Sequence, residues 1–264
     1  MAGRALRERD GGRTAGRLTS PHGWAAAAFA RNAGDYERAR PGYPAAAVSF
    51  LTRRLDLAAG RTVVDVGAGT GKLTRLLRAT GAHVVAVEPV GAMRDLLPAD
   101  VEALCGTAES LPLAAGAADA VTVAQAFHWF DLDRSLPEIQ RVLRPDGRLA
   151  VLSNRRDLDD AVQSAFAEVL LRHRAHPSLE LEFKPVVALE RSGVFTVLER
   201  KAFPFVHELS AGDIVALAAS ESSIALLEDD DQAAALDDFA RLTANKPDPV
   251  RLRYVTDVVI AAPR

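Results

Sequence analysis

A β-branched run that ends in alternating glycines constrains this chain more than any other segment. The run TVVDVGAGTGKL covers positions 62–73 and places Gly67, Gly69 and Gly71 directly after hydrophobic residues. Such a run is typical of a buried parallel strand, and glycines let the backbone turn tightly while a ligand lies close to the main chain. The segment therefore predicts an α/β nucleotide-type fold with a ligand site at the end of its first strand.

Strand-like and helix-like segments alternate through the first half of the chain. Further strands are predicted at 83–89, 101–105, 119–127 and 148–154, and Asp133 is placed to cap the helix that precedes the last of these. This alternation is typical of a doubly wound parallel sheet. The second half predicts helices at 158–173 and 231–243, a strand pair near 194–207, a helix capped by Ser210 and Asp213, and a final strand at 250–260.

Composition excludes several classes of protein. With 264 residues, 48% of them hydrophobic, we expect a flexible tail at 1–23 and a single domain over 24–264. Thirty-two basic residues face thirty-five acidic ones, so no positive field favours nucleic acid or an anionic membrane. The lone Cys105, expected in the core, excludes disulfides, and the histidines show no metal-ligand spacing. We expect a soluble, cytoplasmic, bacterial protein without a metal.

Spacing within the glycine loop rules out two nucleotide-binding patterns. A dinucleotide-binding G-x-G-x-x-G needs a third glycine where Lys72 or Thr74 stands. A P-loop needs Ser or Thr directly after the lysine, where Leu73 stands. What remains is D-x-G-x-G-x-G beginning at Asp65, whose carboxylate can meet a cationic group of a small ligand.

This pattern resembles the first motif of the class I S-adenosylmethionine-dependent methyltransferases, and further motifs follow in that family's order. Glu88 closes the second strand, where a carboxylate can accept both hydroxyl protons of a ribose. GTAESLPL (106–113) resembles the adenine-binding loop, although Thr107 stands where many relatives have Asp. DAVTVAQAFHWFD (119–131), RVLRPDGRLAVLSN (141–154) and LSAGDIVALAASESS (209–223) also resemble family segments. The opening F-x-x-x-A-x-x-Y-x-x-x-R-P-x-Y-P, from Phe29 to Pro44, is similar to the trans-aconitate methyltransferase-like subgroup.

The resemblance implies a fold, a reaction and a set of site residues. The fold would be a mostly parallel, seven-stranded Rossmann-like sheet with an antiparallel last strand and a helical lid at about 155–190 and 204–248. The reaction would be methylation of a small molecule by S-adenosylmethionine, with release of S-adenosylhomocysteine, in a monomer or homodimer. The implied cofactor-binding residues are Tyr36, Arg40, Asp65, Gly67, Ala68, Gly69, Gly71, Glu88, Pro89, Ala108, Glu109, Gln125 and Ala126. Among them, Arg40 would lie near the carboxylate of the cofactor.

Three residues after the fourth strand are candidates for the acceptor pocket. Phe127, His128 and Trp129 follow that strand where the acceptor should lie. His128 could act as a general base, or the HWF phrase could serve packing alone. Two alternatives to a methyltransferase remain open: a non-methylating or non-catalytic S-adenosylmethionine-binding protein, and a nicotinamide-dependent oxidoreductase. A nucleic-acid adenine methylase is disfavoured, because basic clusters are missing.

Overall fold

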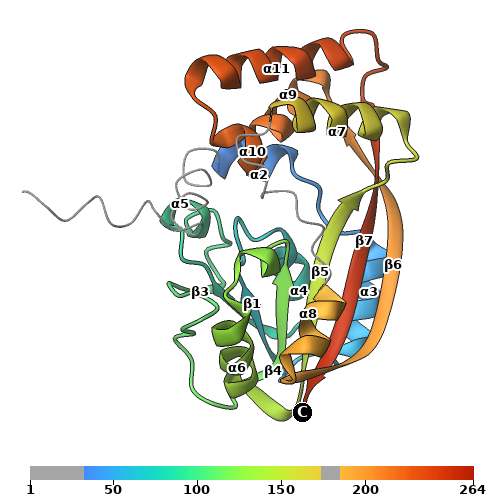
Figure 1. Cartoon of the computed structure of the whole chain (residues 1–264). Helices are drawn as coiled ribbons and strands as arrows, with labels where there is room; N and C mark the ends of the chain where they lie inside the picture. The colour runs from blue at the N-terminus through green and yellow to red at the C-terminus, as the bar shows by residue number, and fades with distance from the viewer. Residues whose placement is uncertain (1–32, 174–184) are drawn as a thin grey trace, which may run out of the picture.

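A seven-stranded sheet forms the centre of the protein (Figure 1). The computed structural model describes residues 33–173 and 185–264, so the predicted tail at 1–23 lies outside the described residues. The strands lie in the order β3-β2-β1-β4-β5-β7-β6. Their bounds are Thr62–Val66 (β1), His83–Val87 (β2), Glu102–Leu104 (β3), Ala118–Ala124 (β4), Leu143–Arg156 (β5), Phe195–Leu209 (β6) and Val250–Pro263 (β7).

The direction of the strands confirms the predicted class of fold. β1 to β5 pair in parallel, whereas β7 runs antiparallel to both β5 and β6. The last strand is thus the one that reverses. β1 carries Val63, Val64 and Val66 fully buried, as expected for a strand that is covered on both faces.

Helices cover the two faces of the sheet and bury its apolar side chains. One face packs against α3 (Ala45–Arg54) and α4 (Lys72–Arg78), which contribute Phe50, Leu51 and Leu77. The other packs against α6 (Leu132–Val142) and α8 (Pro185–Ser192), which contribute Leu136 and Leu189. The short α5 (Gly91–Arg94) follows β2.

A third group of helices stands at one end of the sheet, and we call it the helical cap. It consists of α2 (Ala33–Ala39), α7 (Ala161–His173), α9 (Ala211–Ala219), α10 (Ser222–Ala225) and α11 (Asp229–Thr243), which lie together at the top of Figure 1. Its own core includes Ala39, Phe166, Leu217 and Phe239 together with Tyr254 of β7. The core is continuous with the sheet, so the cap is anchored on it.

One predicted helix cap agrees with the structure, and three other local predictions differ from it. The predicted cap of α9 is confirmed, because Ser210 Oγ accepts a hydrogen bond from the Asp213 amide at 3.1 Å. The strand pair expected near 194–207 is wrong: this segment is one strand, β6, which pairs along its length with β7. α6 begins after Asp131 rather than Asp133. Cys105 is exposed, not in the core, because β3 before it is an edge strand with a neighbour on one side only.

None of the helices described combines the length and apolar composition needed to cross a membrane.

Candidate functional site

A cavity of about 530 Å³ opens beside the carboxyl ends of β1, β2 and β4, and a small hollow adjoins it. This is where open α/β sheets bind ligands. The predicted cofactor residues on the large cavity are Tyr36, Gly67, Gly69, Glu88, Pro89, Ala108, Glu109, Gln125 and Ala126. Those on the small hollow are Tyr36, Arg40, Asp65, Gly67, Ala68, Gly69 and Gln125. Of the thirteen residues expected there, only Gly71 lines neither space; it begins α4 and faces Leu97.

The glycine loop forms the wall shared by the two spaces. Gly67 has φ +68°, and a Cβ there would lie 2.5 Å from the Cβ of Ala126. Gly69 has φ +58°, but a Cβ at that position would meet no atom of the described residues within 4 Å. Gly67 is therefore required by packing, whereas bare main chain at Gly69 leaves the cavity open for a ligand to lie against it.

Asp65 is buried at the end of β1, beside the small hollow. Its carboxylate accepts hydrogen bonds from the hydroxyls of Thr74 at 2.7 Å and Thr122 at 2.9 Å. Burial raises its pKa to about 6, against the opposing effect of these two hydrogen bonds. Thr70 lines the same hollow, and its Oγ1 is buried without a hydrogen-bond partner among residues 33–173 and 185–264. The hollow thus holds polar groups that a polar ligand could satisfy.

Glu88 stands on the large cavity and is tied to the glycine loop. Its Oε2 accepts from the Gly69 amide at 2.9 Å, and its Oε1 accepts from the Val90 amide at 2.9 Å. Burial raises its pKa. Because a carboxylate has about four lone-pair sites, each oxygen retains capacity for a further donor such as a ribose hydroxyl.

The loop after β3 supplies another wall of the large cavity. Ala108 is buried, and Glu109 Oε1 accepts from the Asp131 amide at the start of α6 at 2.9 Å. Met93 and Phe130 add apolar surface to the same cavity. A flat apolar group with polar edges, such as a purine, fits this combination.

The end of β4 carries the strained residue Gln125. Its φ is +57°, a region that residues other than glycine adopt sparingly. Its amide Nε2 donates to the Asn154 carbonyl of β5 at 3.3 Å. The unusual turn directs Ala126 toward Gly67, so it brings the chain after β4 against the glycine loop. Strain of this kind is often kept where a site needs a particular shape.

The three residues predicted to form the acceptor pocket lie in different surroundings. They form a single 3-10 turn in which Phe127 faces inward, is 2% exposed and belongs to the core under α6, so it lines neither cavity. Trp129 lines the large cavity. His128 lines neither, although its ring lies 4.8 Å from that of Trp129.

Part of His128 is exposed to solvent, while protein surrounds the rest of the side chain, and its pKa is lowered to about 4. Desolvation by the surrounding protein is the main cause, and the positive charge of Arg40 adds to it. The ring is therefore neutral at pH 7 and able to accept a proton or a hydrogen bond.

Arg40 borders the small hollow but is also bound to the helical cap. Its Nε donates to Ser220 Oγ at 2.9 Å, and its Nη2 donates to the Ser220 carbonyl at 2.9 Å and to Glu221 Oε2 at 2.8 Å. Its guanidinium carbon lies 5.3 Å from the centre of the Tyr36 ring. Ser220 and Glu221 were not predicted as partners of Arg40, because Ser220 follows it by 180 positions in the chain. The sequence signal that could have pointed to them was the family-like segment at 209–223.

Metal ligands do not gather in the described ranges 33–173 and 185–264, where no three His, Cys, Asp or Glu side chains are placed to hold an ion.

Comparison with known proteins agrees with this geometry. The Methyltransferase domain family matches residues 64–151. An uncharacterized methyltransferase of Mycobacterium tuberculosis is 51% identical over 132 residues, which cover 49% of this chain and 53% of that protein, so the match spans about half the length of this curated relative. An uncharacterized methyltransferase of Schizosaccharomyces pombe is 33% identical over 74% of this chain and 79% of that protein. A solved protein of Anaeromyxobacter dehalogenans, provisionally assigned as a type II methyltransferase, aligns with a TM-score of 0.62 and 25% identity over 85% of this chain and 97% of that chain.

Proposed function

Because the chain belongs to the class I S-adenosylmethionine-dependent methyltransferases, we propose that it methylates a small-molecule acceptor and releases S-adenosylhomocysteine. One observation carries this proposal. Gly69 presents bare main chain to a cavity of about 530 Å³, and the Glu88 carboxylate, bonded to the same glycine, faces that cavity. The arrangement suits a ligand with a ribose next to a compact charged group.

The residues around the two spaces divide the work of binding. Glu88 would accept the ribose hydroxyls through its remaining lone pairs. Ala108 and Glu109 would lie beside the purine. At the other end, Asp65 would meet the ammonium group and Arg40 the carboxylate of the amino-acid portion.

Alignment and exclusion of water are the main tasks that this site performs. S-adenosylmethionine supplies a methyl group already activated by a positively charged sulfur. The protein must then hold the acceptor atom in line with that group and keep water away from it. Trp129 forms part of the cavity wall, and its π face suits a cation.

The need for a base depends on the acceptor. A carboxylate acceptor is already a nucleophile and needs none, whereas a phenol, amine or carbon acid must lose a proton. His128 is neutral at pH 7, but a pKa of about 4 makes it a weak base, and it lines neither cavity, so it would take a proton only from an acceptor that is already strongly acidic. The predicted lid segments 155–190 and 204–248, apart from 174–184, which lie outside the described residues, would select the acceptor.

Titration calorimetry tests the cofactor and product analysis tests the reaction. We expect the purified protein to bind S-adenosylmethionine and S-adenosylhomocysteine but not NADH. Incubation with methyl-labelled S-adenosylmethionine and small-molecule extract should yield a labelled product and S-adenosylhomocysteine in equal amounts. Binding of NADH alone would overturn the proposal, and cofactor binding without product across a broad acceptor panel would favour a non-methylating protein.

A further inference from the structure

Glu221 holds together two arginines that come from different parts of the fold. The residue lies between α9 and α10 of the helical cap. Its Oε2 accepts from Arg40 at 2.8 Å and its Oε1 from Arg156 at 2.6 Å. Burial alone would raise the pKa of Glu221, but the two guanidinium groups hold it below its ordinary value. The carboxylate therefore stays ionised and bridges both cations.

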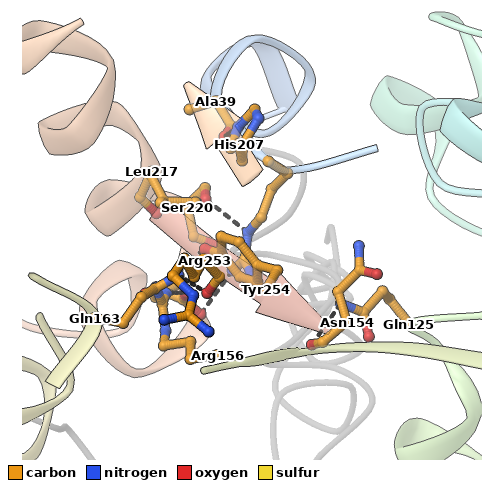
Figure 2. A network of polar contacts seen from close by, with 12 residues as sticks. Ala39, Gln125, Asn154, Arg156, Gln163, His207, Leu217, Ser220, Arg253 and Tyr254 are labelled. Atoms are coloured by element: carbon orange, nitrogen blue, oxygen red, sulfur yellow. Dashed lines mark hydrogen bonds and ion pairs between the residues drawn. The ribbon is translucent and has the colours of Figure 1, made fainter. Parts of the chain in front are cut away.

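Arg156 fixes this carboxylate to the sheet. It stands at the end of β5, where its Nη1 donates to Gln163 Oε1 at 2.8 Å and to the Tyr254 hydroxyl at 3.0 Å (Figure 2). Its guanidinium carbon also lies 4.0 Å from the centre of the Phe166 ring. With partners on α7 and β7, Arg156 has little freedom, so Glu221 is held in one place.

Arg40 contacts the helical cap with one edge of its guanidinium group and borders the small hollow where the cofactor is proposed to bind. The edge formed by Nε and Nη2 is occupied by Ser220 and Glu221. Its Nη1 donates no hydrogen bond within the described residues, and Arg40 borders the same hollow as Asp65. A guanidinium whose one edge is locked presents its remaining nitrogen in a fixed direction, which saves the entropy of ordering a long side chain when a ligand binds.

We propose that Glu221, with Ser220, is a positioning residue that sets Arg40 for the carboxylate of the cofactor's amino-acid portion. The inference rests on the proposed function. Its consequence is that cofactor affinity depends on a cap residue that does not itself touch the cofactor. By linkage, bound cofactor strengthens the attachment of Ser220 and Glu221 to Arg40 by the same factor.

Two ligands separate positioning from a general structural effect. S-adenosylhomocysteine carries the amino-acid carboxylate and ammonium, whereas 5′-methylthioadenosine has the same thionucleoside without either group; the decarboxylated analogue 5′-(3-aminopropylthio)adenosine keeps the ammonium and lacks only the carboxylate, so its Kd should also stay within about twofold. In Glu221→Gln the charge that aligns Arg40 is lost while the side-chain shape is kept. We expect the Kd of S-adenosylhomocysteine, measured by calorimetry, to rise roughly tenfold, as for the loss of one charge-assisted hydrogen bond. The Kd of 5′-methylthioadenosine should stay within about twofold.

A double variant and a matched control complete the design. Arg40→Gln combined with Glu221→Gln should bind S-adenosylhomocysteine no more weakly than Arg40→Gln alone, because Glu221 acts through Arg40. Arg38→Gln is the control: Arg38 also joins α2 to α9, at 2.8 Å from Asp213, but it is exposed and lines neither space. Its affinities should match those of the wild type.

The results separate this inference from the proposed function. Equal losses for both ligands in Glu221→Gln, or an unchanged Kd for S-adenosylhomocysteine, would overturn the positioning role while the wild type still binds. A wild type that binds neither ligand would overturn the proposed function itself. Should Glu221→Gln fail to fold, Ser220→Ala removes the acceptor of Arg40 Nε together with the bond that Ser220 Oγ donates to the Leu217 carbonyl at 2.7 Å, and the same selective loss, smaller in size, is expected.

Discussion

Arginine at Gly69 should abolish cofactor binding while costing little stability, and Gly116 provides the matched comparison. Both glycines have positive φ, +58° and +66°, and within the part of the chain that the structure describes a Cβ at either would meet nothing within 4 Å. Gly69 borders the large cavity, whereas Gly116 lies on the loop before β4 and borders neither space. The two substitutions therefore share their backbone cost and differ only in what the new side chain enters.

The magnitudes follow from these positions. A left-handed conformation costs a residue other than glycine roughly 1–2 kcal/mol. For a domain of this size that lowers the melting temperature by roughly 2–8 °C in both variants. In Gly69→Arg the side chain would separate the cofactor from Glu88, removing two charge-assisted hydrogen bonds of about 1.5–3 kcal/mol each. A loss of roughly 3–6 kcal/mol raises Kd more than about a hundredfold.

The assay pairs thermal unfolding with calorimetric titration of S-adenosylhomocysteine on both variants. Gly116→Arg should bind as the wild type does, and Gly69→Arg should show no binding heat at similar stability. If Gly69→Arg bound with normal affinity, the cofactor would not lie against the glycine loop. If Gly69→Arg unfolded while Gly116→Arg did not, the conclusion that a side chain at position 69 enters open space would be contradicted.

Four further outcomes follow from individual residues. Gly67→Ala should lower the free energy of unfolding by roughly 2–5 kcal/mol, since the left-handed cost adds to overpacking against Ala126; urea unfolding that shows no more loss than Gly116→Ala would contradict this. Glu88→Gln should raise the Kd of S-adenosylhomocysteine about tenfold and bind its 2′-deoxy analogue as well as the parent; retained preference for the ribose would remove Glu88 from that contact. Asp65 has a folded pKa of about 6, above the unfolded value, so its protonated form is favoured in the folded state. The free energy of unfolding, measured with urea, should therefore fall by roughly 3 kcal/mol as pH rises from about 4 through 6, while the calorimetric affinity for S-adenosylhomocysteine should rise over pH 5–7. Asp65→Asn should flatten both profiles. The His128 resonance, assigned against His128→Gln, should show no titration between pH 5 and 8, and a midpoint near 6.5 would contradict the lowered pKa.

Much of the first half of the fold could be predicted from the order of residues. β1, β2 and β4 are short β-branched runs closed by glycine or by polar residues, so local pattern and buried environment agree. The strands of the second half were harder to predict from the sequence. β6 alternates exposed and partly buried residues along fifteen positions, and such a segment reads equally well as a hairpin until its partner is known. That partner, β7, lies more than forty residues later in the chain.

The candidate site shows the same division. The glycine loop and Glu88 follow strand ends directly, so parallel strands bring them to one edge of the sheet. Phe127 could not be told from its pocket neighbours, because a 3-10 turn sends successive side chains in different directions. The partners of Arg40 were missed because no local pattern links it to Glu221.

The order of residues alone determined which segments of the first half become strands and where the glycine loop lies, since hydrophobic period and glycine content act through neighbours a few positions apart. Only the tertiary structure decided which distant charges meet. Glu221 bridges Arg40 and Arg156 because the helical cap packs on one end of the sheet, where the two cations offset the cost of burying the carboxylate. Contacts of that kind depend on packing in three dimensions, which residue spacing along the chain does not encode.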